Sequence, residues 1–143
     1  QSGALIKVLQ KRNAYFNAVL STGLFSKTFC YFTLIQEPKT WTEAQSYCKK
    51  YNTDLATIQS DEDRYKIQEI YSQSEAWIGL SKNLWLWSDQ SKVSWTSVKW
   101  AEGQPDNTNG NEKCGFVRET GLIGDEDCLH PLPFFCTDYK LKL

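Results

Sequence analysis

The sequence lacks the features that mark several large classes of protein. Its 16 Lys and Arg nearly balance 17 Asp and Glu, leaving a formal charge of −1, so there is no extended positive field for nucleic acid or an anionic membrane surface. It has one histidine, His130, and no Cys-x-x-Cys pair. A structural zinc site needs such closely spaced ligand pairs, so their absence argues against one. No apolar run approaches the roughly 20 residues that a membrane-spanning helix needs. The sequence therefore predicts no nucleic-acid partner, no structural zinc and no membrane span in this chain.

What the sequence has instead is a high content of large aromatic side chains. Aromatic residues make up 14% of the 143 residues, with six Trp, seven Tyr and seven Phe. Such rings bury a large apolar area per residue, so a chain of this length can still form a substantial core. Length and composition together predict one globular domain.

Five cysteines, at positions 30, 48, 114, 128 and 136, indicate disulfide bonds rather than metal ligands. Disulfides persist in oxidising compartments, so we expect a secreted protein or one on the extracellular face of the cell. The sequence by itself does not choose among the three pairings of four cysteines. Because the number is odd, one thiol needs a separate explanation.

Residues 1–30 differ from the rest of the chain and have two interpretations. Basic residues precede a mostly apolar stretch at 14–25, which is the outline of a secretory signal peptide. The apolar residues between Leu5 and Leu20 also fall near helical spacing, which favours a short helical neck. In the first interpretation Cys30 leaves with the leader, and four cysteines remain.

After residue 30, helices are expected first and strands afterwards. Strand formers fill residues 31–35 and stop before Pro38. One helix opens at Thr40, with Glu43 completing a capping box, and a second starts at Ser60. Beyond them the sequence predicts short strands at 76–80, 84–87, 94–96, 113–117 and 133–137, with a polar loop at 101–112. This order predicts an α+β fold.

The order of these landmarks resembles the C-type lectin-like domain over roughly residues 31–138. The matching segments are Thr40-Trp41-Thr42-Glu43-Ala44-Gln45-Ser46-Tyr47-Cys48, Asp54-Leu55-Ala56, Trp77-Ile78-Gly79-Leu80, Trp87-Ser88-Asp89, Gln104-Pro105-Asp106 and the spacing of Cys114, Cys128 and Cys136. The resemblance implies a domain over 31–140, with two helices packed on short antiparallel sheets and a long irregular ligand loop. It also implies the disulfides Cys48–Cys136 and Cys114–Cys128.

Gln104-Pro105-Asp106 carries the most informative chemistry. Proline biases the residue before it toward an extended conformation, and side chains two apart in an extended run face the same side. The side-chain oxygens of Gln104 and Asp106 can therefore converge on one hard cation. The resemblance implies that this proline is cis and adds Glu112 and Asp125 as further ligands. Together the four residues offer roughly five of the six to eight oxygens that calcium takes.

The resemblance further implies that sugar hydroxyls or water complete the shell of the ion, and that Gln-Pro-Asp is the galactose-type form of the motif. Two departures predict weak binding at a single site. The family's Trp-Asn-Asp triplet reads Ile123-Gly124-Asp125 here, so one ligand is missing. The loop 107–111 also has no aromatic ring to stack on a sugar. If the site is a worn version of the family's, Gly124→Asn should raise the calcium affinity.

Two functions of different classes follow. The first is a calcium-dependent carbohydrate-binding module of galactose-type preference, with Gln104, Asp106, Glu112 and Asp125 serving both the ion and the sugar. The second is a calcium-independent domain that binds a protein ligand through the same loop face, which Gly124 favours. A glycosidase needs a carboxylate pair in which one pKa is raised, and nothing in the sequence shows one, so we expect no enzyme. An oligomer is compatible with both functions.

Overall fold

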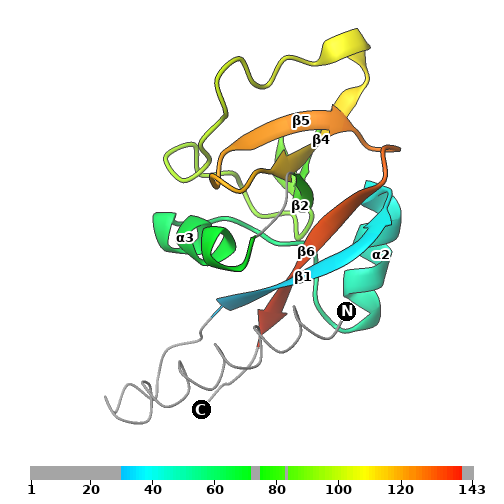
Figure 1. The fold of residues 1–143 in the computed structure, drawn as a ribbon, viewed down its shortest axis with the longest axis vertical. Coiled ribbons are helices and arrows are strands. Elements are labelled where there is room, and N and C mark those ends of the chain that lie inside the picture. The colour runs from blue at the N-terminus through cyan, green and yellow to red at the C-terminus, as the bar shows by residue number, and fades with distance from the viewer. Residues whose placement is uncertain (1–29, 72–74, 83, 140–143) are drawn as a thin grey trace.

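The computed structural model describes residues 30–71, 75–82 and 84–139. A six-stranded sheet runs through them in the order β1-β6-β2-β4-β5, with β3 paired to β2 (Figure 1). The strands are β1 (Cys30–Lys39), β2 (Ala76–Ser81), β3 (Leu86–Trp87), β4 (Glu112–Val117), β5 (Ile123–Asp127) and β6 (Leu132–Tyr139). Neighbouring strands pair antiparallel except β2 and β6, which meet in parallel at Trp77 and Phe134. The sheet is therefore mixed rather than purely antiparallel.

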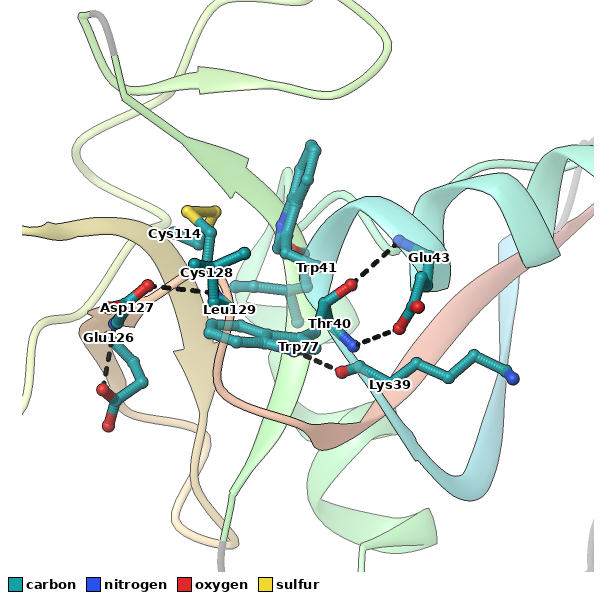
Figure 2. The surroundings of a disulfide bond; sticks show 11 residues. Lys39, Thr40, Trp41, Glu43, Trp77, Cys114, Glu126, Asp127, Cys128 and Leu129 are labelled. Atoms are coloured by element: carbon teal, nitrogen blue, oxygen red, sulfur yellow. Dashed lines mark hydrogen bonds between the residues drawn. A yellow bond between two sulfur atoms is a disulfide. The ribbon is translucent and has the colours of Figure 1, made fainter.

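Both expected helices form, and both begin where their caps predict. In α2 (Trp41–Lys50) the Thr40 hydroxyl accepts the Glu43 N–H at 3.4 Å, and the Glu43 carboxylate accepts the Thr40 N–H at 3.0 Å (Figure 2). In α3 (Asp61–Ile70) the Ser60 hydroxyl accepts the Asp63 N–H at 3.2 Å. These bonds satisfy N–H groups that the first turn of a helix leaves without partners.

The strands differ from the expectation at four places. Strand β1 continues through Pro38 to Lys39, with an irregular register beyond Ile35. The expected strand at 84–87 shortens to β3, and residues 95–97 form a turn instead of a strand. Strand β5 is not expected from the sequence at all. Pro38 is tolerated because a proline at an irregular point of an edge strand removes no ladder hydrogen bond.

Two tryptophans join the helices to the sheet. Trp77 of β2 is fully buried, and its indole N–H donates to the carbonyl of Lys39 at 3.0 Å. Trp41 of α2 donates in turn to the carbonyl of Ile78 at 2.8 Å. Figure 2 shows both rings beside the junction of β1 and α2. Each indole thus packs in the core and still satisfies its polar atom.

Both disulfides that the resemblance implies are present. Cys48 of α2 is bonded to Cys136 of β6. Cys114 of β4 is bonded to Cys128, which follows β5 (Figure 2). They close loops with sequence separations of 88 and 14 residues. In the chain-entropy account these loops correspond to about 4–5 and about 3 kcal/mol of stabilisation. The second disulfide ties together the two strands that carry the candidate site.

The leader or neck interpretation concerns residues 1–30, and all of these except Cys30 lie outside the described residues. Cys30 begins β1, where its backbone pairs with Tyr139. Among the described helices, none combines the length and the apolarity needed to cross a bilayer.

Candidate metal centre

A long loop, residues 88–111, leads from β3 to β4 and carries the motif (Figure 1). Backbone hydrogen bonds hold it against the start of β5, since Ala101 donates to the Ile123 carbonyl and Ile123 donates to that of Lys99, both at 2.8 Å. A turn follows, in which the Gln104 N–H donates to the Ala101 carbonyl at 2.9 Å. Gly103 adopts φ 79° there, which glycine reaches without steric cost.

Three carboxylates from three segments converge beyond this turn. Asp106 comes from the loop, Glu112 opens β4 and Asp125 lies in the middle of β5. One oxygen from each lies within 4.8 Å of the others. Asp125 is only 2% exposed, whereas Asp106 is exposed and Glu112 is half-buried. The cluster is therefore buried at Asp125 and accessible to solvent at Asp106 and Glu112.

Asp125 organises the motif through hydrogen bonds. Its two carboxylate oxygens accept the N–H groups of Asp106 and Asn107, each at 2.9 Å. Its own N–H donates to the Gln104 side-chain carbonyl at 3.1 Å. The Gln104–Pro105 peptide is cis, as the resemblance implies. The structure thus brings all four predicted residues, Gln104, Asp106, Glu112 and Asp125, into one connected group.

The pKa values of two of these carboxylates are shifted in opposite directions. Burial raises the pKa of Glu112, and its contacts with Asp106 and Asp125 act in the same direction against a hydrogen bond from Thr108. Hydrogen bonding with Glu112 lowers the pKa of Asp106. The Thr108 N–H donates to Glu112 Oε2 at 2.9 Å. A bound cation would relieve part of the repulsion among these carboxylates.

The donor set fits a hard cation. Carboxylate oxygens and one amide oxygen are the ligands that calcium takes, and nitrogen or sulfur donors, which softer metals prefer, are not in the cluster. The Gln104 oxygen and the Asp125 oxygens each accept one N–H, and each keeps a further lone pair. Gln104, Asp106, Glu112 and Asp125 could therefore hold a calcium ion.

The ring of Phe116 occupies the space next to Gly124. A Cβ built at Gly124 would lie 2.5 Å from Phe116 Cζ, 2.9 Å from Phe116 Cε1 and 3.2 Å from Gln104 Oε1. Phe116 is itself buried, with 3% of its surface exposed. The expected gain from Gly124→Asn therefore needs correction, because the ring of Phe116 takes the space that an asparagine side chain would need.

Two contributors to the site have no signal in the sequence. Thr108 acts through its backbone N–H, which any residue but proline would supply. Phe116 lies eight residues before Gly124 and faces it only because β4 and β5 pair in the register Phe116↔Gly124. The absence of a side chain at 124 could have prompted a search for a bulky partner, but not its identity.

The chain matches known proteins over most of its length. The family model of the Lectin C-type domain matches residues 37–138. E-selectin of Oryctolagus cuniculus is 35% identical over 131 residues, which cover 77% of this chain and 24% of that protein. C-type lectin BfL-1 of Bungarus fasciatus is 34% identical over 121 residues, which cover 75% of each. The chain thus spans about a quarter of that E-selectin and three quarters of BfL-1.

Solved structures agree with this match. The carbohydrate-recognition domain of the mouse scavenger receptor C-type lectin superposes with a TM-score of 0.71 at 26% identity, covering 80% of this chain and 95% of that one. A calcium-independent type II antifreeze protein shares the fold at 22% identity and a TM-score of 0.70, covering 78% and 88%. The matched family and fold are those of binding domains rather than of an enzyme. The chain belongs to the C-type lectin domain family.

Proposed function

We propose that this chain is a calcium-dependent carbohydrate-binding module of galactose-type preference. The observation that carries the proposal is the convergence of Asp106, Glu112 and Asp125 within 4.8 Å, joined to Gln104 by a hydrogen bond at 3.1 Å. When bound, calcium supplies a coordination point for neighbouring sugar hydroxyls. The buried Asp125 fixes the loop, while the more accessible residues face the ligand.

The sugar preference rests on the donors and acceptors that the protein offers. Asp106 and Glu112 present carboxylate oxygens, which accept hydrogen bonds from hydroxyls. The Gln104 amide can donate through its nitrogen while its oxygen accepts the Asp125 N–H. An amide at 104 and a carboxylate at 106 form the arrangement that the galactose-type motif implies. The missing side chain at Gly124 and the ring-free loop 107–111 support weak binding at each site.

The same proposal includes where the chain works. Two disulfides join distant segments of the domain, and such bonds persist in oxidising compartments. A secreted protein, or a domain on the extracellular face of the cell, meets glycans there. Extracellular modules also bind calcium in roughly the 10⁻⁴–10⁻³ M range, so a weakened site can still be occupied.

A second function is favoured by one specific observation. Both oxygens of the Asp125 carboxylate already accept loop N–H groups, so the loop has hydrogen bonds of its own that do not depend on an ion. A calcium-independent domain that binds a protein ligand through this loop would use that property. The antifreeze protein with the same fold is described as calcium-independent.

Calcium titration separates the two functions. With the intact chain, we expect about millimolar calcium to raise the melting temperature and to permit retention on immobilised galactose, with both effects reversed by a chelator. Asp106→Ala should abolish the retention without unfolding the domain, because Asp106 is exposed. Glu102→Ala removes another exposed carboxylate from the same loop, and this variant should still be retained on immobilised galactose. Retention by Asp106→Ala, or the absence of any calcium effect, would favour the protein-binding function.

A further inference from the structure

Three tryptophans gather before the motif, with Trp85 in the turn between β2 and β3 and with Trp95 and Trp100 in the loop 88–111. The ring centroids of Trp85 and Trp100 are 5.1 Å apart. Those of Trp95 and Trp100 are 6.3 Å apart, with planes inclined by only 26°. Trp85 and Trp100 are half-buried and pack against the core. Trp95 is 54% exposed, so one indole of the cluster is offered to solvent on a rigid support.

The other two rings are not free to take a ligand. The ammonium of Lys82 lies 4.9 Å from the centroid of Trp85, which covers that ring with a cation–π contact. Trp100 is held between the core and Trp95. An isolated exposed apolar side chain is ordinary, but a large ring held flat against a second one is a stacking surface. Trp95 is therefore the ring of this cluster that can stack on a ligand.

This cluster adjoins the carboxylates along β5. Trp100 forms a bridge with Ile123, and Asp125 lies two residues further along the strand, about 7 Å away at the rise of an extended chain. One turn joins Trp100 to Gln104, through the hydrogen bond from the Gln104 N–H to the Ala101 carbonyl. Trp100 thus lies beside the segments that carry Gln104 and Asp125.

We propose that Trp95, supported by Trp100, is a subsite that stacks on the second ring of a galactose-terminated oligosaccharide. The inference rests on the proposed function, which places the terminal sugar at the carboxylates. The C–H face of a pyranose is apolar and flat, and it matches an exposed indole. Because loop 107–111 has no ring, stacking from Trp95 would supply apolar contact that the terminal sugar lacks.

A protein partner fits this surface less well. A stable protein interface buries about 800 Å² on each side around an apolar centre. Here one half-exposed indole stands in a loop whose polar residues, such as Ser94 and Thr96, hydrogen-bond to each other at 2.9 Å. One open ring among hydroxyls is an arrangement typical of small, polar ligands that need one apolar contact.

Calorimetry with three sugars tests the subsite. Galactose, lactose and melibiose would be titrated in saturating calcium, because the two disaccharides direct their second ring differently from the galactose. We expect at least one disaccharide to bind about fivefold to tenfold more tightly than galactose. Trp95→Ala should remove that gain and leave both the galactose affinity and the calcium midpoint unchanged. Trp95→Phe, which keeps a flat ring, should retain most of the gain.

Tyr51→Ala is the matched control, since it removes a ring that is 59% exposed at the end of α2, away from the loop (Figure 1). A disaccharide gain that survives Trp95→Ala, or that is absent from the unmodified chain while galactose still binds, would overturn the subsite alone. Loss of all calcium-dependent sugar binding in the unmodified chain would overturn the proposed function and the subsite with it.

Discussion

Gly124 and Phe116 share one space between β4 and β5. Any side chain at 124 would begin 2.5 Å from the end of the phenyl ring, and the ring is buried. We therefore expect Gly124→Asn to destabilise the domain by about 1–3 kcal/mol through overpacking, with no gain in calcium affinity. Urea unfolding and a calcium titration of the same sample measure the two effects.

A second substitution makes room for the asparagine. Phe116→Leu shortens the residue that faces Gly124, so the variant carrying both changes should recover part of the stability lost by Gly124→Asn alone. It should also bind calcium more tightly than Phe116→Leu, which serves as the reference. Equal stability of Gly124→Asn and the unmodified chain would show that the ring moves aside without cost.

Glu112 determines the pH below which the calcium affinity should fall. A carboxylate must lose its proton to act as a ligand, and burial raises the pKa of Glu112 above its ordinary value of 4.5. Calcium affinity should therefore fall as the pH is lowered through that raised pKa, at a higher pH than an ordinary glutamate would give. The lowered pKa of Asp106 keeps that carboxylate ionised further into acid.

Calcium titrations between about pH 4 and 7 measure this fall. Glu112→Gln should bind calcium more weakly at neutral pH and show a shallower pH dependence, because its amide does not titrate. His130 lies outside the carboxylate cluster, 3.4 Å from Glu126, so His130→Gln is the control and should keep the steep dependence. A pH profile that is the same in Glu112→Gln and the unmodified chain would contradict the role of Glu112.

The helices were predictable because their signals are local. Thr40 and Glu43 lie within one turn of each other and make the expected capping box. Ser60 begins the second helix as expected, and its side chain accepts the Asp63 N–H. A cap needs only its own few residues, so tertiary structure has little opportunity to override it. For the same reason both predicted helix starts are confirmed.

The strands were less predictable because pairing partners are distant in sequence. The aromatic residues near 84–87 and 94–96 are typical strand formers, but Trp85 and Trp95 lie in turns and each packs on Trp100. Strand β5 carries Asp125, Glu126 and Asp127, residues with low strand propensity. Pairing with β4, in the register Gly115↔Asp125, outweighs that propensity.

The candidate site was predictable in part. Gln104 and Asp106 follow from a local motif, and the resemblance supplies Glu112 and Asp125. What the sequence does not contain is the way Asp125 accepts two loop N–H groups, or the contact of Phe116 with Gly124. Both depend on the β4–β5 register and on the path of the loop, which no short pattern specifies.

The two disulfides have different structural roles in the domain. Cys48–Cys136 ties α2 to β6, and α2 lies apart from β4 and β5 (Figure 1). Cys114–Cys128 begins two residues after Glu112 and ends three residues after Asp125. The first closes the longer loop and should contribute more to global stability, whereas the second fixes the two strands that present the carboxylates.

Replacing each cysteine pair by alanine separates these roles. Removing Cys48–Cys136 should lower the free energy of unfolding by about 4–5 kcal/mol, and removing Cys114–Cys128 by about 3 kcal/mol. Calcium affinity should follow the opposite order. Without Cys114–Cys128 the ends of β4 and β5 are free to separate, and we expect about a tenfold loss, as when the supports of metal ligands are removed. Calcium titration well below each variant's melting temperature would show this reversal, and equal calcium affinities in the two variants would contradict it.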